Sequence, residues 1–323
     1  MVNSFNVFRT FVRGCQKILG DTWPLRMVEH KLLKGVTNGL MAPLFIIGAP
    51  RTGSTLLYQL LIQNYNFSFF NNLQSFFFGS PALIAKLTRN IDVTKSCQQL
   101  VQSKYGYIPG LFAPSESATI FRHWFGDSDP SAHIADPARA IIRKTVVYLS
   151  ATVPAPFIAK NLNNALRLAT ISAVLPETIF VWIKRHPLYA SQSLIKMRRR
   201  LYGSDDIWAS IKPPSYAKII ERSPFEQVVW QIKDIDDLIS QYFAGKERAR
   251  LIKIKYESLC QRPDKELDMI AQNYHRLSGL KLQRTESRET ILLEARNKRQ
   301  LPETEWKRLK ETVNDIIGVT DSI

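Results

Sequence analysis

A run of four apolar residues, Leu44–Ile47, opens the clearest hydrophobic pattern in the sequence. Its length and composition predict a buried strand. The chain then passes through residues 48–53, which begin and end with glycine, into Ser54 and an apolar pattern with the period of a helix. We therefore expect a strand, a tight turn and a helix. Such a turn directs backbone N–H groups and the positive end of a helix dipole toward one point, which suits a phosphate group.

The same alternation continues along the chain. Further strands are predicted at residues 156–159, 178–183 and 250–255. Helical periodicity lies between and after these strands, at residues 165–175, from residue 187, at residues 225–242 and at residues 263–277. Residues 136–150 also predict a helix, with Asp136 as its cap and Pro137 in its first turn. The alternation is typical of an α/β fold with a central parallel sheet flanked by helices, whose ligands gather at the carboxyl ends of the strands.

Residues 3–19 predict a basic amphipathic helix ahead of this pattern. Its apolar face is formed by Phe5, Phe8, Val12, Cys15 and Leu19. A helix of this kind either packs on the domain or docks on a membrane surface, and packing is the favoured alternative because most such helices cover a core. We expect residues 1–42 to form an N-terminal helical extension and residues 43–323 to form one domain with helical insertions and a basic C-terminal segment.

The charge of the chain predicts an anionic partner. With 44 Lys and Arg against 28 Asp and Glu, the formal net charge is +16, which fits a nucleotide, a nucleic acid, an acidic polysaccharide or an anionic membrane surface. The phenylalanine-rich residues 67–78 contain no Lys or Arg, whereas a nucleic-acid stacking platform would interleave the two. Nucleic acid is therefore the less favoured partner, and these rings are expected in a core or a pocket wall.

Cysteine usage and hydropathy indicate the cellular compartment of the protein. Cys15, Cys97 and Cys260 lie far apart without C-x-x-C spacing, so neither a disulfide framework nor a zinc site is indicated. No apolar run approaches the roughly 20 residues of a membrane span, and the first 20 residues lack a signal-peptide core. We expect a cytoplasmic protein.

Two further stretches carry candidate chemistry. Residues 112–126 place Glu116 and His123 among aromatic residues, a setting that shifts pKa values and produces general bases. The basic run at residues 296–299 has three interpretations, which are a solvated face, a flap over an anionic ligand, and a nucleic-acid contact.

Residues 48–57, GAPRTGSTLL, resemble the 5′-phosphosulfate-binding loop of sulfotransferases that use 3′-phosphoadenosine 5′-phosphosulfate (PAPS). The form with Arg51 is similar to that of tyrosylprotein, carbohydrate and bacterial sulfotransferases. A nucleoside-triphosphate P-loop would place Lys where this chain has Ser54. Arg51 would supply the cation instead.

A second stretch, residues 185–193, resembles the 3′-phosphate site of the same family. In that family a strand ends in Arg and a Ser follows eight positions later, as Arg185 and Ser193 do, although Ser191 is a second candidate. His186 departs from the usual Asp. Lys160 with Asn161, and residues 254–259 including Tyr256, resemble two further family segments, so the resemblance covers roughly residues 43–275.

The resemblance implies a role for each matching residue. The tyrosylprotein enzymes place a Glu soon after the first helix, whereas residues 64–78 contain no carboxylate, so Glu116 is the candidate general base and His123 the alternative. Arg51 and Lys160 are the candidate catalytic cations. The residues expected to bind the nucleotide are Arg51, Thr52, Gly53, Ser54, Thr55, Leu56, Arg185, Ser193 and Tyr256.

The resemblance implies a sulfotransferase that moves the sulfuryl group from PAPS to a hydroxyl, or less favourably an amine, without a metal. A carbohydrate or glycolipid is the expected acceptor. Two other classes remain as alternatives. A P-loop kinase or NTPase would need the missing Lys and a carboxylate that holds Mg²⁺, and a nucleic-acid-binding protein would use the net charge directly.

Overall fold

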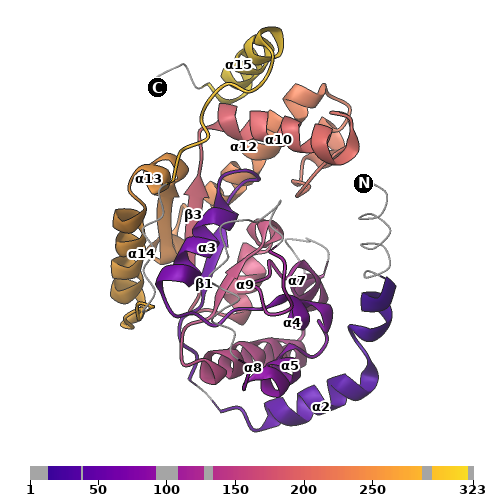
Figure 1. The fold of residues 1–323 in the computed structure, drawn as a ribbon, viewed down its shortest axis with the longest axis vertical. Helices are drawn as coiled ribbons and strands as arrows, with labels where there is room; N and C mark the ends of the chain where they lie inside the picture. Colours follow the sequence, from indigo (N-terminus) through magenta and orange to yellow (C-terminus); the bar gives the residue numbers. More distant parts are fainter. Residues whose placement is uncertain (1–13, 38, 92–107, 127–133, 286–292, 319–323) are drawn as a thin grey trace.

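The computed structural model describes residues 14–37, 39–91, 108–126, 134–285 and 293–318. Its centre is a four-stranded sheet in the order β2-β1-β3-β4 (Figure 1). All three strand pairs are parallel. The strands are β1 (Leu44–Ile47), β2 (Ile158–Lys160), β3 (Ile179–Lys184) and β4 (Leu251–Lys255). The predicted parallel α/β sheet is confirmed, with strand ends displaced by one or two residues.

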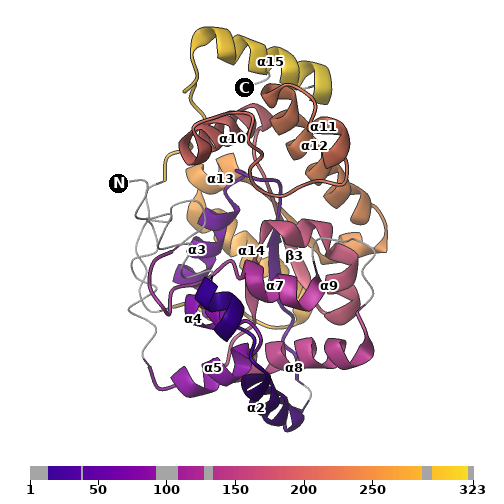
Figure 2. The same ribbon diagram turned by 90° about the vertical axis from the view of Figure 1, so that its right-hand side faces the viewer.

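Helices connect the strands and cover both faces of the sheet (Figures 1 and 2). The α-helices are α2 (Trp23–Lys34), α3 (Ser54–Asn64), α4 (Asn72–Phe76), α5 (Pro81–Thr88), α7 (Ala118–Phe125), α8 (Asp136–Thr152), α9 (Leu168–Val174), α10 (Pro187–Tyr202), α11 (Tyr216–Ile219), α12 (Pro224–Tyr242), α13 (Tyr256–Gln261), α14 (Pro263–Ser278) and α15 (Glu303–Ile317). Two short 3₁₀ helices are η2 (Leu162–Leu166) and η3 (Lys246–Arg250).

Strand β1 shows why the core has two halves. Successive side chains of a strand point to opposite faces of the sheet. Phe45 and Ile47 join one buried cluster with residues of α7, α8, α9 and α12, while Leu44 and Ile46 join another with residues of α3 and α14. A strand covered on both faces must be apolar throughout, which explains the uninterrupted run in the sequence.

The phenylalanine-rich stretch contributes Phe70 to the first of these clusters and Phe67 to the second. Phe70 packs edge to face against Phe157, Trp124 and Phe121, with ring centroids 4.9, 5.4 and 6.1 Å away. Phe67 is also buried, while Phe69 and the three phenylalanines at residues 76–78 are half-buried. The expectation of a core role is confirmed for Phe67 and Phe70.

Several segments differ from the sequence predictions, and α4, α5 and α7 are among the helices that were not predicted. Residue 135 is the N-cap of α8, so Asp136 lies in the first turn and does not cap the helix. Residues 203–223, for which no helix was predicted, contain α11. Residues 14–19 are helical as predicted, but a helix that was not predicted, α2, follows them, and residues 3–13 lie outside the described residues.

The two ends of the described chain lie far apart. Helix α2 packs on α5 and α8 at one end of the molecule, whereas α15 packs on α10 and α12 at the other (Figures 1 and 2). Trp306, Leu309 and Val313 of α15 form a third apolar cluster with residues of α10 and α12. Within the described residues, no helix is both long and apolar enough to cross a lipid bilayer.

Candidate active site at the carboxyl ends of the strands

The loop between β1 and α3 has an unusual backbone. Arg51 has φ +67° and Gly53 has φ +90°, both in the left-handed region. The buried Thr52 hydroxyl donates a 2.8 Å hydrogen bond to the Ala49 carbonyl, which ties the loop to itself. The side chain of Thr52 therefore supports the loop, and only its backbone can face a ligand.

Gly53 caps α3 without supplying any side-chain acceptor. The first N–H groups of a helix have no partner within the helix, so those of Ser54, Thr55 and Leu56 can donate to a ligand. A Cβ atom on Gly53 would lie 2.4 Å from the ring of Tyr256, the residue that follows β4. The loop is therefore glycine-dependent and shaped for an anion at the start of α3.

Three side chains from distant parts of the sequence meet beside this loop. Lys160, the last residue of β2, donates to the Glu116 carboxylate and, over 3.2 Å, to the Thr55 hydroxyl. The Thr55 hydroxyl in turn donates to Glu116 Oε1 over 2.9 Å. Asn161 holds the same segment by donating to the Glu116 carbonyl over 3.0 Å. A base candidate, a cation candidate and a phosphate-loop residue thus form one network.

Burial governs the charge of Lys160. Its side chain is 3% exposed. Burial lowers the pKa of the Lys160 ammonium, the Glu116 carboxylate opposes this effect, and the charge of Arg51 acts in the same direction as burial. Arg51 and Lys160, the two predicted catalytic cations, are therefore close enough to influence each other.

The second predicted phosphate site adjoins the first through Arg51. Arg51 Nε donates to Ser193 Oγ over 3.0 Å, and Arg185 Nη1 donates to the Arg51 carbonyl over 3.2 Å. The sequence suggested two separate anion sites, whereas the folded chain joins them into one surface. Ser191, the alternative ligand, is fully buried, so Ser193 has the better position.

Arg185 is held from two further sides. Its guanidinium lies over the Tyr256 ring at 4.4 Å, donates from Nε to Asn297 Oδ1 over 3.0 Å, and donates from Nη2 to the Arg296 carbonyl over 2.6 Å. Burial lowers the pKa of Arg185, and Tyr256 and Glu257 oppose this. The backbone of the basic run at residues 296–299 therefore passes directly over the Arg185 side chain.

Glu257 and Gln192 anchor this crossing segment, and neither was a candidate from the sequence. Glu257 Oε1 accepts from Asn297 Nδ2 over 2.7 Å and from the His186 backbone over 3.0 Å. Gln192 Nε2 donates to the Lys298 carbonyl over 3.0 Å. Their only sequence signal was their position inside residues 185–193 and 254–259, the stretches that contain Arg185 and Tyr256.

His186 caps the helix that carries Ser193. Its Nδ1 accepts from the Leu188 backbone over 3.3 Å at the start of α10. An Asp at this position would also be a favoured cap. The departure from the family pattern is therefore compatible with the same local structure.

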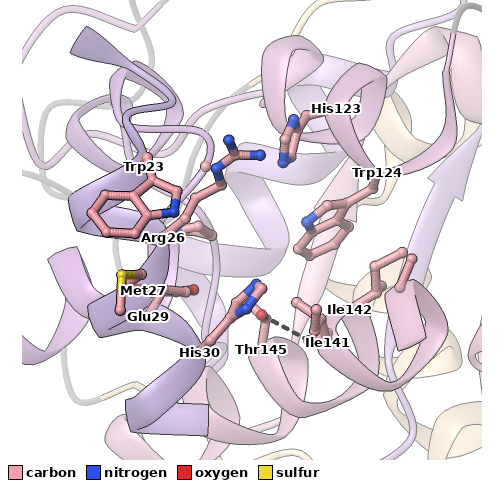
Figure 3. A pocket seen from close by; sticks show the side chains of 13 residues that line it. Trp23, Arg26, Met27, Glu29, His30, His123, Trp124, Ile141, Ile142 and Thr145 are labelled. Carbon is pink, nitrogen blue, oxygen red and sulfur yellow. Dashed lines mark hydrogen bonds between the residues drawn. The ribbon is translucent and has the colours of Figure 1, made fainter.

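His123 lies away from the network of Glu116 and Lys160. It lines a pocket of about 270 Å³ between α2, α7 and α8, beside Arg26 and Trp124 (Figure 3). Its Nδ1 is 3.8 Å from Asp21 Oδ2, and burial lowers its pKa while Asp21 opposes the shift. The structure brings together every other predicted site residue around the loop, but not His123.

Comparisons with known proteins agree with this geometry. Sulfotransferase STF9 from Mycobacterium avium has a TM-score of 0.51 at 15% identity, over 78% of this chain and 71% of that one. Sulfotransferase STF1 from Mycobacterium tuberculosis H37Rv has a TM-score of 0.51 at 16% identity, over 85% of this chain and 76% of that one. At these identities the likeness establishes the fold. Among curated proteins, none matches the chain.

The sequence itself matches the family model described as the sulfotransferase family over residues 43–274. That range begins one residue before β1 and ends within α14, so it contains the sheet, the loop and all the strand ends that form the site. The chain therefore belongs to the sulfotransferase family.

Proposed function

We propose that this sulfotransferase takes its sulfuryl group from PAPS and transfers it to a hydroxyl of a carbohydrate or glycolipid. The contact of Glu116 with both Lys160 and Thr55 carries the proposal, because Glu116 would then serve as the base and Lys160 as the cation beside the loop that would bind the donor. Sulfotransferase family membership supports the PAPS donor. An amine acceptor is the less favoured variant.

The proposed site offers hydrogen-bond donors to both phosphates of the nucleotide. The N–H groups at the start of α3 and the hydroxyls of Ser54 and Thr55 would bind the 5′-phosphosulfate. Arg185 and Ser193 would bind the 3′-phosphate. A guanidinium has five N–H donors, of which three hold Arg185 in place, so two can reach a phosphate.

In the proposed transfer, the acceptor oxygen bonds to sulfur as the bond from sulfur to the 5′-phosphate oxygen breaks. The electron pair of the broken bond leaves with adenosine 3′,5′-bisphosphate, and the hydroxyl proton moves to Glu116. By analogy with phosphoryl transfer, charge spreads over the non-bridging oxygens in a loose transition state. Arg51 and Lys160 would stabilise that charge, so the chemistry requires no metal.

The segment at residues 296–299 would act as a flap over the nucleotide, one of the three interpretations open from its sequence. Its backbone touches Arg185 and Gln192, while the side chains of Lys298 and Arg299 are exposed. A bound 3′-phosphate would lie beside these cations. A role at the proposed nucleotide site therefore accounts for these contacts better than a separate nucleic-acid contact does.

The proposed acceptor class rests on charge. The formal net charge of +16 favours an acidic glycan or a glycolipid in an anionic membrane surface. In this proposal the enzyme works in the cytoplasm, with residues 1–42 as an extension that contacts membranes.

A screen with [³⁵S]-labelled PAPS over glycans, glycolipids and small alcohols tests the proposal. We expect label on a glycan or glycolipid hydroxyl, and far less when Glu116→Gln replaces the wild type. Exclusive labelling of small alcohols would contradict the acceptor class. Binding of ATP with Mg²⁺ in preference to adenosine 3′,5′-bisphosphate would contradict the donor, and so would nucleic-acid binding that survives saturation with the bisphosphate.

A further inference from the structure

A cluster of exposed apolar side chains marks the end of the molecule formed by α2. Ile18 is 73% exposed, Trp23 67%, Met27 52%, Val28 49% and Leu19 48%. They fall within eleven consecutive residues of the chain. We call these five side chains, with the basic residues described below, the α2 face. So dense an exposed apolar group is typical of an interaction surface.

Helix α2 is oriented by contacts on its opposite side. Leu33 is buried there, and the buried Glu29 carboxylate accepts hydrogen bonds from the backbones of Ala82 and Leu83 at the start of α5, over 3.0 and 2.6 Å. Helix α2 also packs on α8. The exposed apolar side chains are therefore presented by a helix that is already fixed on the domain.

Charge identifies the partner of the α2 face. Lys17, Arg26, Lys31 and Lys34 are exposed beside the apolar side chains. The two acidic residues in residues 14–37 are Asp21, which pairs with Arg26, and Glu29, which is buried. The described part of this segment thus presents apolar and cationic groups without an exposed carboxylate.

We infer that the α2 face docks on a lipid bilayer that contains anionic headgroups. An interfacial helix of this kind inserts Trp and aliphatic side chains at the headgroup boundary, and each nearby Lys adds attraction to anionic lipid. A symmetric dimer through this face would gather the basic residues of both copies in one interface, where the face supplies no exposed carboxylate to pair with them. The bilayer satisfies both the apolar and the charged groups.

The pocket beside α2 adds room for a headgroup. Trp23, Arg26, Met27 and His30 of α2 line it together with His123 and Trp124 of α7 (Figure 3). A lipid headgroup that enters this recess would lie against Arg26 and His30. This docking surface lies outside the strand-end site, so it does not depend on which acceptor the enzyme uses.

Sedimentation with vesicles tests the inference on the full chain. We expect binding to phosphatidylcholine vesicles that contain phosphatidylglycerol, little binding to phosphatidylcholine alone, and weakening with added salt. Lys31→Glu with Lys34→Glu should weaken binding at least about tenfold. Lys265→Glu with Lys281→Glu, two exposed lysines on and after α14, is the matched control and should bind as wild type.

A second pair of variants tests the apolar side chains of the α2 face. Trp23→Ser with Met27→Ser should also lose binding, whereas Leu201→Ser with Ile207→Ser, which are exposed elsewhere, should keep it. Thermal melting and affinity for adenosine 3′,5′-bisphosphate should match wild type in all four variants. Equal binding by the α2-face variants and their controls would overturn the inference. So would a concentration-dependent dimer that Trp23→Ser with Met27→Ser abolishes, in the absence of vesicle binding.

Discussion

Lys160 and Glu116 form an ion pair at the carboxyl end of β2, although 44 residues separate them in the sequence. Thr55, from the helix after β1, donates to the same carboxylate. A buried ammonium requires such a partner, because an unpaired charge in a protein interior is costly. The pair therefore fixes the segment that carries Glu116 against the loop that begins at Gly48.

Replacing Glu116 by Gln should reduce turnover by roughly 10²- to 10⁴-fold, the usual contribution of a general base. The amide keeps the shape of the carboxylate but cannot accept the hydroxyl proton. Single-turnover sulfuryl transfer would measure the effect. Glu311→Gln, an exposed position on α15, serves as the matched control. Turnover near that of the control would remove Glu116 from the role of base.

Lys160→Met should reduce turnover by about 10²-fold or more, because a fixed cation is lost where charge develops. Affinity for adenosine 3′,5′-bisphosphate should change far less, since Lys160 contacts Thr55 and Glu116 instead of the 3′-phosphate site. Calorimetry and kinetics on the same preparation separate the two effects. A parallel loss of affinity and turnover would place Lys160 in ground-state binding.

Arg185→Ala should weaken binding of adenosine 3′,5′-bisphosphate by about 1.5–3 kcal/mol, the range of a charge-assisted hydrogen bond. The same change should loosen residues 296–297, which accept two hydrogen bonds from Arg185. Calorimetry measures the affinity, and limited proteolysis measures the loosening. Arg276→Ala on α14 is the control. Unchanged nucleotide affinity would show that the 3′-phosphate binds elsewhere.

Gly53→Ala should abolish nucleotide binding and lower the free energy of unfolding by about 1–3 kcal/mol. The new Cβ would meet the Tyr256 ring at 2.4 Å, in a backbone conformation with φ +90°. Gly245→Ala is the control, because its Cβ would meet no atom within 4 Å. Denaturant unfolding and calorimetry provide the measurements. A stable variant that binds nucleotide would mean that the loop relaxes at low cost.

Glu29 should give the stability of the protein a pH dependence. Burial raises the pKa of its carboxyl from 4.5 to about 7, against the lowering effect of the Leu83 and Ala82 N–H groups. A group whose pKa is raised on folding stabilises the protein fully below the unfolded value, and this stabilisation is lost as pH rises through the folded value. Glu29 should therefore contribute up to about 3 kcal/mol at pH 4.5 that disappears above pH 7.

Glu29→Gln removes this titration. The difference in unfolding free energy between pH 5 and pH 8 should shrink in the variant relative to wild type, as measured by urea unfolding at each pH. An unchanged difference would show that Glu29 is ionised in both states across that range.

The order and type of the main elements could be predicted from the sequence. Leu44–Ile47 is apolar because β1 is covered on both faces, and the glycines of residues 48–53 reveal the turn before α3. Helix α2 was missed, because Trp23, Met27 and Val28 are exposed in a segment whose buried positions are Glu29 and Leu33. Hydrophobic periodicity does not predict such a helix, because several apolar residues are exposed and an acidic residue is buried.

Only those site residues that stand in local sequence motifs could be predicted. Arg51, Arg185 and Ser193 stand in recognisable motifs, so two anion sites were predicted, but the contact of Arg51 with Ser193 that joins them was not. Glu257 lies in residues 254–259, which resemble a family segment, but the resemblance gave it no role, and its contact with Asn297 across 40 residues depends on how residues 296–299 pass the start of α13. His123 shared an aromatic setting with Glu116, yet α7 directs it toward Asp21.

By itself, the sequence determined the strand-loop-helix unit, the parallel sheet and the glycine-dependent loop, because these depend on the local period of apolar residues and on glycine conformation. Only the tertiary structure decided which titratable groups meet. Glu116 reaches Lys160 and Thr55, and residues 296–299 cross Arg185, through packing between segments that are distant in the chain. Such contacts depend on the docking of whole helices, which no local pattern encodes.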